Sequence, residues 1–129
     1  MAKRYLIDTS AVIKYLNNTF SAEGLLMIDE IIDQECLLSF ITEVELQSWN
    51  PTNNQDLSVY IDFVNQSYVY YVDNEIIKET ILLRKTYGIK IPDAFIAATA
   101  LVNDLTLIAD NDKDFLKISL LKYINPNKI

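Results

Sequence analysis

The 129-residue sequence contains no histidine and only one cysteine, and these absences exclude several kinds of chemistry. Without histidine there is no imidazole general base, no Ser-His-Asp triad and no histidine-rich zinc site. Cys36 has no partner for an intramolecular disulfide, and its apolar neighbours indicate a small buried side chain in a reducing compartment. Catalysis is left to carboxylates, hydroxyls and lysines, and such oxygen ligands suit Mg²⁺ or Mn²⁺.

Glycine, proline and long apolar runs are also scarce. Two glycines and three prolines punctuate the chain, and no low-complexity linker or internal repeat is visible. The apolar stretch after the basic N-terminus is interrupted by Asp8 too early for a signal-peptide core. No uncharged run approaches the roughly 20 apolar residues of a membrane-spanning helix. We therefore expect one domain over residues 1–129 in the cytoplasm, with no membrane contact.

Basic residues are outnumbered, with 11 lysines and arginines against 18 aspartates and glutamates and a net charge of −7. This balance argues against a non-specific nucleic-acid binder, because affinity for phosphates comes mainly from cationic side chains. The objection weakens if the acids converge on one site, where bound divalent cations would invert the local field. An acidic surface also suits a basic protein partner.

Apolar segments of strand type alternate with amphipathic segments of helix type. The expected strands are residues 5–8, 36–40, 68–72, 105–109 and 121–124. The expected helices are residues 10–17, 23–33, 42–49, 57–66, 74–87 and 92–102, with Gly88 as a C-terminal cap. This order predicts an α/β fold, a three-layer α/β/α sandwich around a mainly parallel sheet of four to five strands.

Two aspartates stand where an apolar segment meets a turn. Asp8 ends the first expected strand, and Asp93 opens an apolar helix rich in small residues. In a parallel sheet flanked by helices, ligands bind at the carboxyl ends of the strands, where both would lie. A helix-capping carboxylate is the simplest alternative for either residue taken alone.

A third acid follows the second expected strand. Thr42 and Glu45 have the spacing of a capping box, which would give Glu45 a structural task. Glu43 would have no such task and therefore becomes the candidate ligand, with a solvated first-turn glutamate as the alternative.

The fourth acidic segment follows the strand at residues 105–109 and contains Asp110, Asp112 and Asp114. An EF-hand is excluded because Phe115 and Leu121 stand where glycine and glutamate are required. A small pocket has room for one or two more ligands, so we expect two of these aspartates to be solvated. Four acidic clusters in one crevice would repel one another unless a divalent cation were bound.

Four segments together resemble the PIN-domain ribonucleases, and within them the VapC-type toxins of bacterial toxin-antitoxin pairs. They read Leu-Ile-Asp-Thr-Ser-Ala at 6–11, Ile-Thr-Glu-Val-Glu-Leu at 41–46, Ile-Pro-Asp-Ala-Phe-Ile-Ala-Ala-Thr-Ala at 91–100 and Leu-Ile-Ala-Asp-Asn-Asp-Lys-Asp-Phe at 107–115. The resemblance runs in order over nearly the whole chain. It implies a Mg²⁺-dependent endoribonuclease, with Mn²⁺ as a substitute, often a homodimer, inhibited by a cognate antitoxin whose C-terminal segment enters the active-site groove.

Carried onto this chain, the family's acidic positions match Asp8, Glu43 and Asp93, with Asp8 and Asp93 as the metal ligands. The family commonly has Thr or Ser followed two residues later by Asp or Asn, whereas this chain has Ala109 and then Asn111. The fourth ligand therefore stays open. We count Asp112 with the catalytic acids. The candidates for the fourth ligand or for outer-shell contacts are Asp110, Asn111, Asp114, Thr9 and Ser10. The alternative for Thr9 and Ser10 is that they only begin the helix.

The hypothesis is hydrolysis of RNA phosphodiesters by metal-activated water, with Glu43 and an acid of the last loop positioning the water or a second ion. Basic residues near the expected turns are candidates for phosphate contact: Arg84, Lys90 and Lys113, beside Lys14 and Lys85. A catalytically weak or inactive PIN-fold module that binds RNA or protein is the main alternative. A phosphohydrolase with Asp8 as nucleophile ranks third, because Ser10 stands where such enzymes usually carry a second aspartate.

Overall fold

The structure, a computed structural model, describes residues 3–129 and contains a five-stranded, all-parallel sheet. The strands are β1 (Tyr5–Ile7), β2 (Leu37–Ser39), β3 (Tyr68–Tyr70), β4 (Thr106–Ile108) and β5 (Tyr123–Ile124), in the order β3-β2-β1-β4-β5. Every residue of β2 and β4 is buried, as expected for strands covered on both faces. The chain adds β2 and β3 on one side of β1, and β4 and β5 on the other. Such a switch in direction opens a crevice beyond the carboxyl end of β1.

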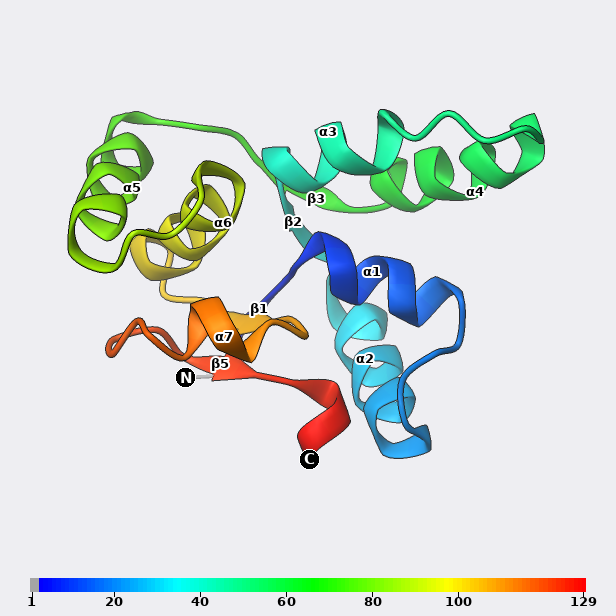
Figure 1. The fold of residues 1–129 in the computed structure, drawn as a ribbon. Coiled ribbons are helices and arrows are strands. Elements are labelled where there is room, and N and C mark those ends of the chain that lie inside the picture. The colour runs from blue at the N-terminus through cyan, green and yellow to red at the C-terminus, as the bar shows by residue number, and fades with distance from the viewer. Residues whose placement is uncertain (1–2) are drawn as a thin grey trace.

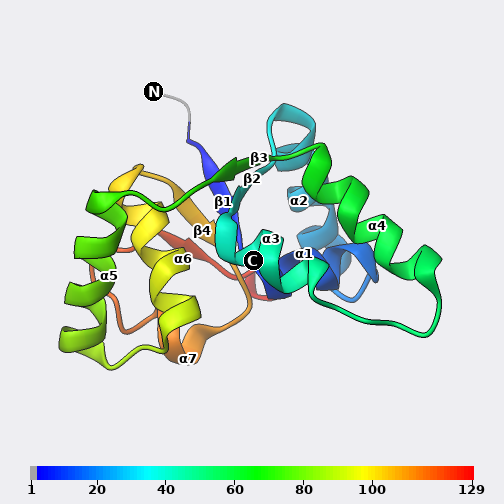
Figure 2. The same ribbon diagram turned by 90° about the horizontal axis from the view of Figure 1, so that it is seen from above.

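Helices cover both faces of this sheet (Figures 1 and 2). They are α1 (Thr9–Leu16), α2 (Ala22–Gln34), α3 (Phe40–Gln47), α4 (Asn54–Asn65), α5 (Asn74–Tyr87), α6 (Ile91–Val102) and the short α7 (Asp112–Phe115), followed by the 3-10 turn η1 (Pro126–Lys128). Figure 2 shows α5 and α6 on one side of the strands and α1, α2 and α4 on the other. The predicted three-layer α/β/α fold is confirmed.

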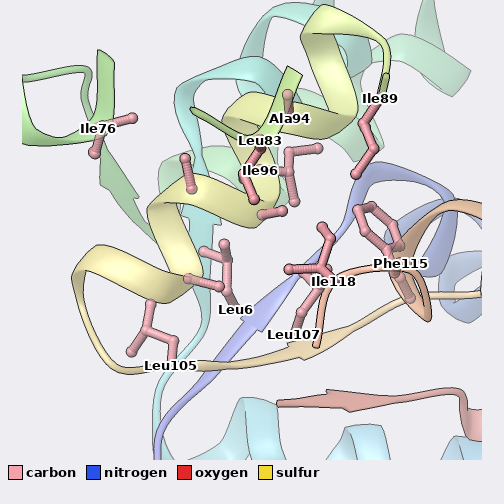
Figure 3. Packing of buried hydrophobic residues seen from close by; sticks show 14 of the residues in the cluster. Leu6, Ile76, Leu83, Ile89, Ala94, Ile96, Leu105, Leu107, Phe115 and Ile118 are labelled. Carbon is pink, nitrogen blue, oxygen red and sulfur yellow. The ribbon is translucent and has the colours of Figure 1, made fainter. Parts of the chain in front are cut away.

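Alternating residues of each strand divide the core into two halves. Leu6, Leu37 and Leu107 pack with α5, α6 and α7, whereas Ile7, Leu38 and Ile108 belong to the half formed with α1 to α4. The apolar side of α6 consists largely of small side chains, which let its backbone approach the sheet and α5 closely. Figure 3 shows Ala94 and Ile96 of α6 in this packing, with Phe115 and Ile118 nearby. Dense packing on both sides gives α6 a fixed position, and with it Asp93.

Several element boundaries differ from the predicted ones. The helix expected from residue 57 begins at Asn54, because Asn53 accepts a hydrogen bond from the backbone N–H of Gln55. Helix α7 was not predicted, since its four residues are too few to show a period. Gly88 has the left-handed conformation (φ 68°) expected of a C-terminal cap of α5, so that prediction is confirmed.

The start of α3 differs in a way that matters for function. The helix begins at Phe40, with Ser39 as its N-cap and the Ser39 hydroxyl accepting the N–H of Ile41. Thr42 is therefore already inside the helix, and Glu45 lies in its second turn. The prediction that Thr42 and Glu45 form a capping box is wrong, and Glu45 is free for another task.

None of the helices between residues 3 and 129 combines the length and apolarity needed to cross a bilayer.

Candidate acidic site

A pocket of about 350 Å³ opens beyond the carboxyl end of β1, where the sheet meets the first turns of α1 and α6. It is lined by Asp8, Thr9, Ser10, Ile13, Glu45, Asp93, Asp110 and Asn111. Residues far apart in sequence meet here because the parallel strands end at this edge, and α6, which leads into β4, begins there. Asp8 and Asp93, the two aspartates predicted to lie at this edge of the sheet, both line this pocket.

Asp8 is the most buried acid of this pocket, with 5% of its surface exposed. Although it occupies the N-cap position of α1, its side chain makes no capping hydrogen bond. Instead Asp8 Oδ2 accepts a hydrogen bond from the Ser10 hydroxyl at 2.7 Å. Burial raises the pKa of Asp8, the Ser10 hydrogen bond partly offsets that rise, and the charge of Glu45 adds to it. Helix capping therefore does not account for this buried carboxylate.

Asp93 lies in the first turn of α6, directly after Pro92. Partial burial raises the pKa of Asp93 to about 6, and the neighbouring carboxylates of Asp8, Asp114 and Glu45 contribute to the rise. The ion pairs among residues 3–129 involve neither Asp8, Asp93 nor Glu45. These three acids therefore repel one another without a compensating cation from the protein.

Glu45 lines the pocket, whereas Glu43 does not. The Thr9 hydroxyl donates to Glu45 Oε1 at 2.6 Å and lies 2.9 Å from the hydroxyl of Thr42. Glu43 Oε1 instead accepts a hydrogen bond from the Tyr71 hydroxyl at 3.2 Å. Helical residues two positions apart point about 200° away from each other around the axis, so Glu43 and Glu45 lie on different sides of α3.

The structure therefore brings Glu45, and not the predicted Glu43, to the pocket, and neither glutamate caps α3. The difference arises because the predicted helix begins at Thr42, two residues after Phe40, where α3 begins. The signal in the sequence was Ser39 itself, a good N-cap residue at the end of the strand.

The acids of the last loop differ sharply in their surroundings. Asp110 pairs with Lys14 and accepts the side-chain amide of Asn125 at 2.8 Å. Asp112 pairs with Lys128 and accepts the Tyr123 hydroxyl at 2.7 Å. The Lys128 hydrogen bond is the main reason why the pKa of Asp112 falls to about 2. Asp112, a predicted catalytic acid, lies outside the pocket lining and is already neutralised by Lys128.

Asn111 and Asp114 are the members of this loop that face Asp93. Asn111 Nδ2 lies 3.4 Å from Asp93 Oδ2 and 3.2 Å from Asp114 Oδ2. Asp114 also has Lys117 at 3.9 Å, an i,i+3 pair. Of the fourth-ligand candidates, these two therefore have the closest relation to Asp93.

The predicted phosphate-contact residues lie outside the pocket lining. The Arg84 guanidinium donates to the carbonyl of Ile89 at 3.0 Å and so ties the end of α5 to the turn before α6. Lys90 and Lys113 are exposed at the starts of α6 and α7, and phosphate contact by all three residues stays a prediction. Lys14 pairs with Asp110, so its charge is already engaged.

Within residues 3–129, no three acidic side chains stand close enough together to form a ready-made metal cage. The chemistry of the donors nevertheless suits a hard divalent cation, because Asp8, Asp93 and Glu45 offer only oxygen ligands. Their mutual repulsion and the raised pKa values of Asp8 and Asp93 are what a bound cation would relieve. The residues present therefore fit Mg²⁺ or Mn²⁺.

Comparison with known proteins identifies the family of this chain and structures of the same fold. The sequence model of the PIN domain family matches residues 5–121. The fold is similar to that of VapBC-1 from nontypeable Haemophilus influenzae, at 25% identity and a TM-score of 0.77, covering 96% of this chain and 98% of that one.

Two further solved structures are similar over nearly their whole length. DNA-bound VapBC from Salmonella typhimurium gives a TM-score of 0.80 at 18% identity, with 97% and 99% coverage of this chain and that one. A toxin-antitoxin complex from Klebsiella pneumoniae gives 0.75 at 23% identity, again with 97% and 99% coverage. No curated protein matches the sequence.

Proposed function

Because the chain belongs to the PIN domain family, whose members are generally nucleases, we propose that it is a Mg²⁺-dependent endoribonuclease and the toxin of a toxin-antitoxin pair. The observation that carries the proposal is the group of uncompensated acids, Asp8, Asp93 and Glu45, in one pocket. The solved toxin-antitoxin complexes of the same fold support the assignment to such a pair.

The metal would be held by Asp8 and Asp93, with Asn111 or Asp114 completing its surroundings. Mg²⁺, or Mn²⁺ in its place, supplies positive charge to the phosphate and acidifies water when bound. Ser10 orients the Asp8 carboxylate through its hydroxyl. The Pro92 turn and the packed body of α6 fix the position of Asp93.

Glu45 takes the role that the sequence predicted for Glu43. Its carboxylate stands at the pocket, oriented by the Thr9 hydroxyl, and accepts a proton from the attacking water. The water oxygen forms a bond to phosphorus, one P–O ester bond breaks, and the leaving oxygen takes up a proton from solvent, so one fragment ends in a phosphate and the other in a hydroxyl. Lys90 and Lys113 flank the pocket-bearing turns and would contact RNA phosphates on either side.

The test is cleavage of single-stranded RNA with Mg²⁺, with EDTA, and by the variants Asp8→Asn and Asp93→Asn. The proposal predicts Mg²⁺-dependent cleavage that EDTA and both substitutions remove, while circular dichroism shows an intact fold. Equal cleavage by wild type and both variants would sink it.

A non-catalytic module that binds RNA or protein is the second candidate, favoured by Ala109 and by the neutralised Asp112. If the protein is such a module, a filter-binding assay should show RNA retained on the protein, without cleavage at any concentration of Mg²⁺ or Mn²⁺.

We also propose a homodimer and a basic antitoxin segment as partners. Exposed Ile77 and Ile81 lie one turn apart on α5, which gives an apolar stripe suited to a subunit interface. The net charge of −7 and the acidic pocket favour an antitoxin with arginines or lysines. Light scattering of wild type and Ile81→Glu tests the dimer, which the substitution should dissociate.

A further inference from the structure

The C-terminal residues are built into the loop that carries Asn111. Strand β5 pairs with β4, and η1 follows directly, so residues 123–128 lie beside the loop at 109–112. We call Tyr123, Asn125 and Lys128 the C-terminal clamp, because their side chains bond to that loop. The proposed function uses none of these three residues.

Asn125 bridges the two neutralised aspartates. Its side chain is buried, with 7% of the residue exposed. Asn125 Nδ2 donates to Asp110 Oδ1 at 2.8 Å and to Asp112 Oδ1 at 3.1 Å, while its Oδ1 accepts the N–H of Asn127 at 3.0 Å. Both amide protons and the amide oxygen are thus engaged, and two carboxylates that would repel each other share one donor group.

Tyr123 fixes the backbone between those two aspartates. Its hydroxyl accepts the backbone N–H of Asn111 at 3.0 Å and donates to Asp112 Oδ1 at 2.7 Å. Its ring packs on Phe115, with 5.7 Å between the ring centroids, so the hydroxyl is held in place by core packing. One half-buried phenol therefore links the core to Asn111.

The 3-10 turn η1, which follows Asn125 and contains Lys128, packs against α2. The Ser21 backbone N–H donates to Asn127 Oδ1 at 3.1 Å, and a Cβ on Gly24 would lie only 2.6 Å from the carbonyl oxygen of Pro126. Glycine is thus required where η1 approaches α2. The position of η1 is set by α2, independently of the acidic pocket.

The consequence appears at the side chain of Asn111. Asparagine at an N-cap position usually caps its helix, yet the Asn111 side chain makes no capping bond to α7. Its amide faces Asp93 and Asp114 instead, at 3.4 and 3.2 Å. With its backbone N–H held by Tyr123, Asn111 is directed into the pocket.

We infer that Tyr123 and Asn125 are positioning residues for the acidic pocket, which hold the loop at 109–112 so that Asn111 faces Asp93. The inference rests on the proposed function for its catalytic meaning, but the contact itself is testable without RNA. Asp110 and Asp112 then serve the loop's structure, and Asn111 serves the site.

The main test is Tyr123→Phe, which removes the hydroxyl and keeps the ring that packs on Phe115. We expect hydrogen exchange of the Asn111 backbone amide, measured by NMR, to speed up about tenfold, and the Mn²⁺ Kd, measured by electron paramagnetic resonance, to rise about three- to tenfold. Tyr15→Phe is the matched control, because the Tyr15 hydroxyl also bonds to an aspartate, Asp29, outside the pocket lining. It should change neither quantity.

A double substitution separates positioning from general loosening. Because Tyr123 acts through Asn111, Tyr123→Phe should raise the Mn²⁺ Kd little further in an Asn111→Ala background. Unchanged exchange at Asn111, an unchanged Mn²⁺ Kd, or an equal rise in both backgrounds would overturn the inference. Absence of RNA cleavage by the wild type would refute the proposed function alone. If the wild type binds no Mn²⁺, the metal part of the inference fails, and amide exchange still decides whether Tyr123 holds Asn111.

Discussion

Two groups of acids lie side by side in this molecule and differ in their electrostatics. Asp8 and Asp93 have raised pKa values because burial and neighbouring carboxylates disfavour their ionised forms. Asp110 and Asp112 have lowered pKa values, chiefly because Lys14 and Lys128 bond to them. The density of acids is thus a poor guide to a metal site. The acids that the protein leaves without a cation are the ones suited to bind one.

The largest expected difference concerns the two glutamates of α3. Glu45→Gln should lower the RNA cleavage rate by roughly a hundredfold, because it removes the proposed proton acceptor of the pocket. Glu43→Gln is the matched control on the same helix and should stay within about twofold of wild type. Initial rates on one RNA substrate check both. A larger loss from Glu43→Gln would return the role to Glu43.

Metal-linked stability should come next in size. A hundredfold excess of Mn²⁺ over its Kd would stabilise the native state by about 2.7 kcal/mol, or a rise of about 10 °C in Tm for a chain of this length. Asp93→Asn should lose most of that rise, whereas Asp112→Asn should keep it. Differential scanning fluorimetry with and without Mn²⁺ measures the shifts in Tm. Equal shifts in both variants would contradict the distinction between the acids with raised pKa and those with lowered pKa.

The pH dependence of stability should have opposite signs in the two groups. The folded pKa of Asp93, about 6, lies above its unfolded value, so without metal its contribution to the free energy of unfolding declines as pH rises from about 4 to about 6. The folded pKa of Asp112, about 2, lies below its unfolded value, so its contribution is present above about pH 4 and is lost toward pH 2.

Urea unfolding in EDTA across this range measures both trends. Asp93→Asn should remove part of the decline between pH 4 and 6. A variant whose stability declines as steeply as that of wild type would contradict a raised pKa at Asp93.

The smallest effect is expected at Lys14. Replacement by Met removes the partly exposed ion pair with Asp110. Such pairs contribute less than about 1 kcal/mol to the free energy of unfolding. Asn125 still bonds to Asp110, so the loop should keep its position. We expect a Tm within a few degrees of wild type and cleavage within about twofold. A loss comparable to that of Glu45→Gln would place Lys14 in the working site.

The fold was predictable because its signals are local and repeated. Apolar strand-type segments alternating with helical ones specify a parallel sheet covered on both faces, and the five expected strands all occur. Asp8 was predictable at the carboxyl end of β1, and Asp93 at the first turn of α6, which leads into β4 and begins at the same edge of the sheet. Their proposed task as metal ligands stays a prediction.

The remaining site residues depend on choices that the local sequence leaves open. Ser39 and Thr42 are both good N-cap residues, and the structure uses Ser39, so Glu45 and not the predicted Glu43 lines the pocket. The partners of residues 110–112 are Lys14, Tyr123, Asn125 and Lys128, which lie beyond the reach of local patterns. Spacing alone could not identify which aspartates a lysine would neutralise.

Mn²⁺ binding measured by isothermal titration calorimetry at pH 7.5, in wild type, Asp8→Asn and Asp110→Asn, tests the central claim most directly. The account predicts that Asp8→Asn abolishes binding, because it removes an uncompensated acid from the pocket. Asp110→Asn should bind within about threefold of wild type, because Lys14 already neutralises that carboxylate. Retained binding in Asp8→Asn, or loss confined to Asp110→Asn, would contradict it.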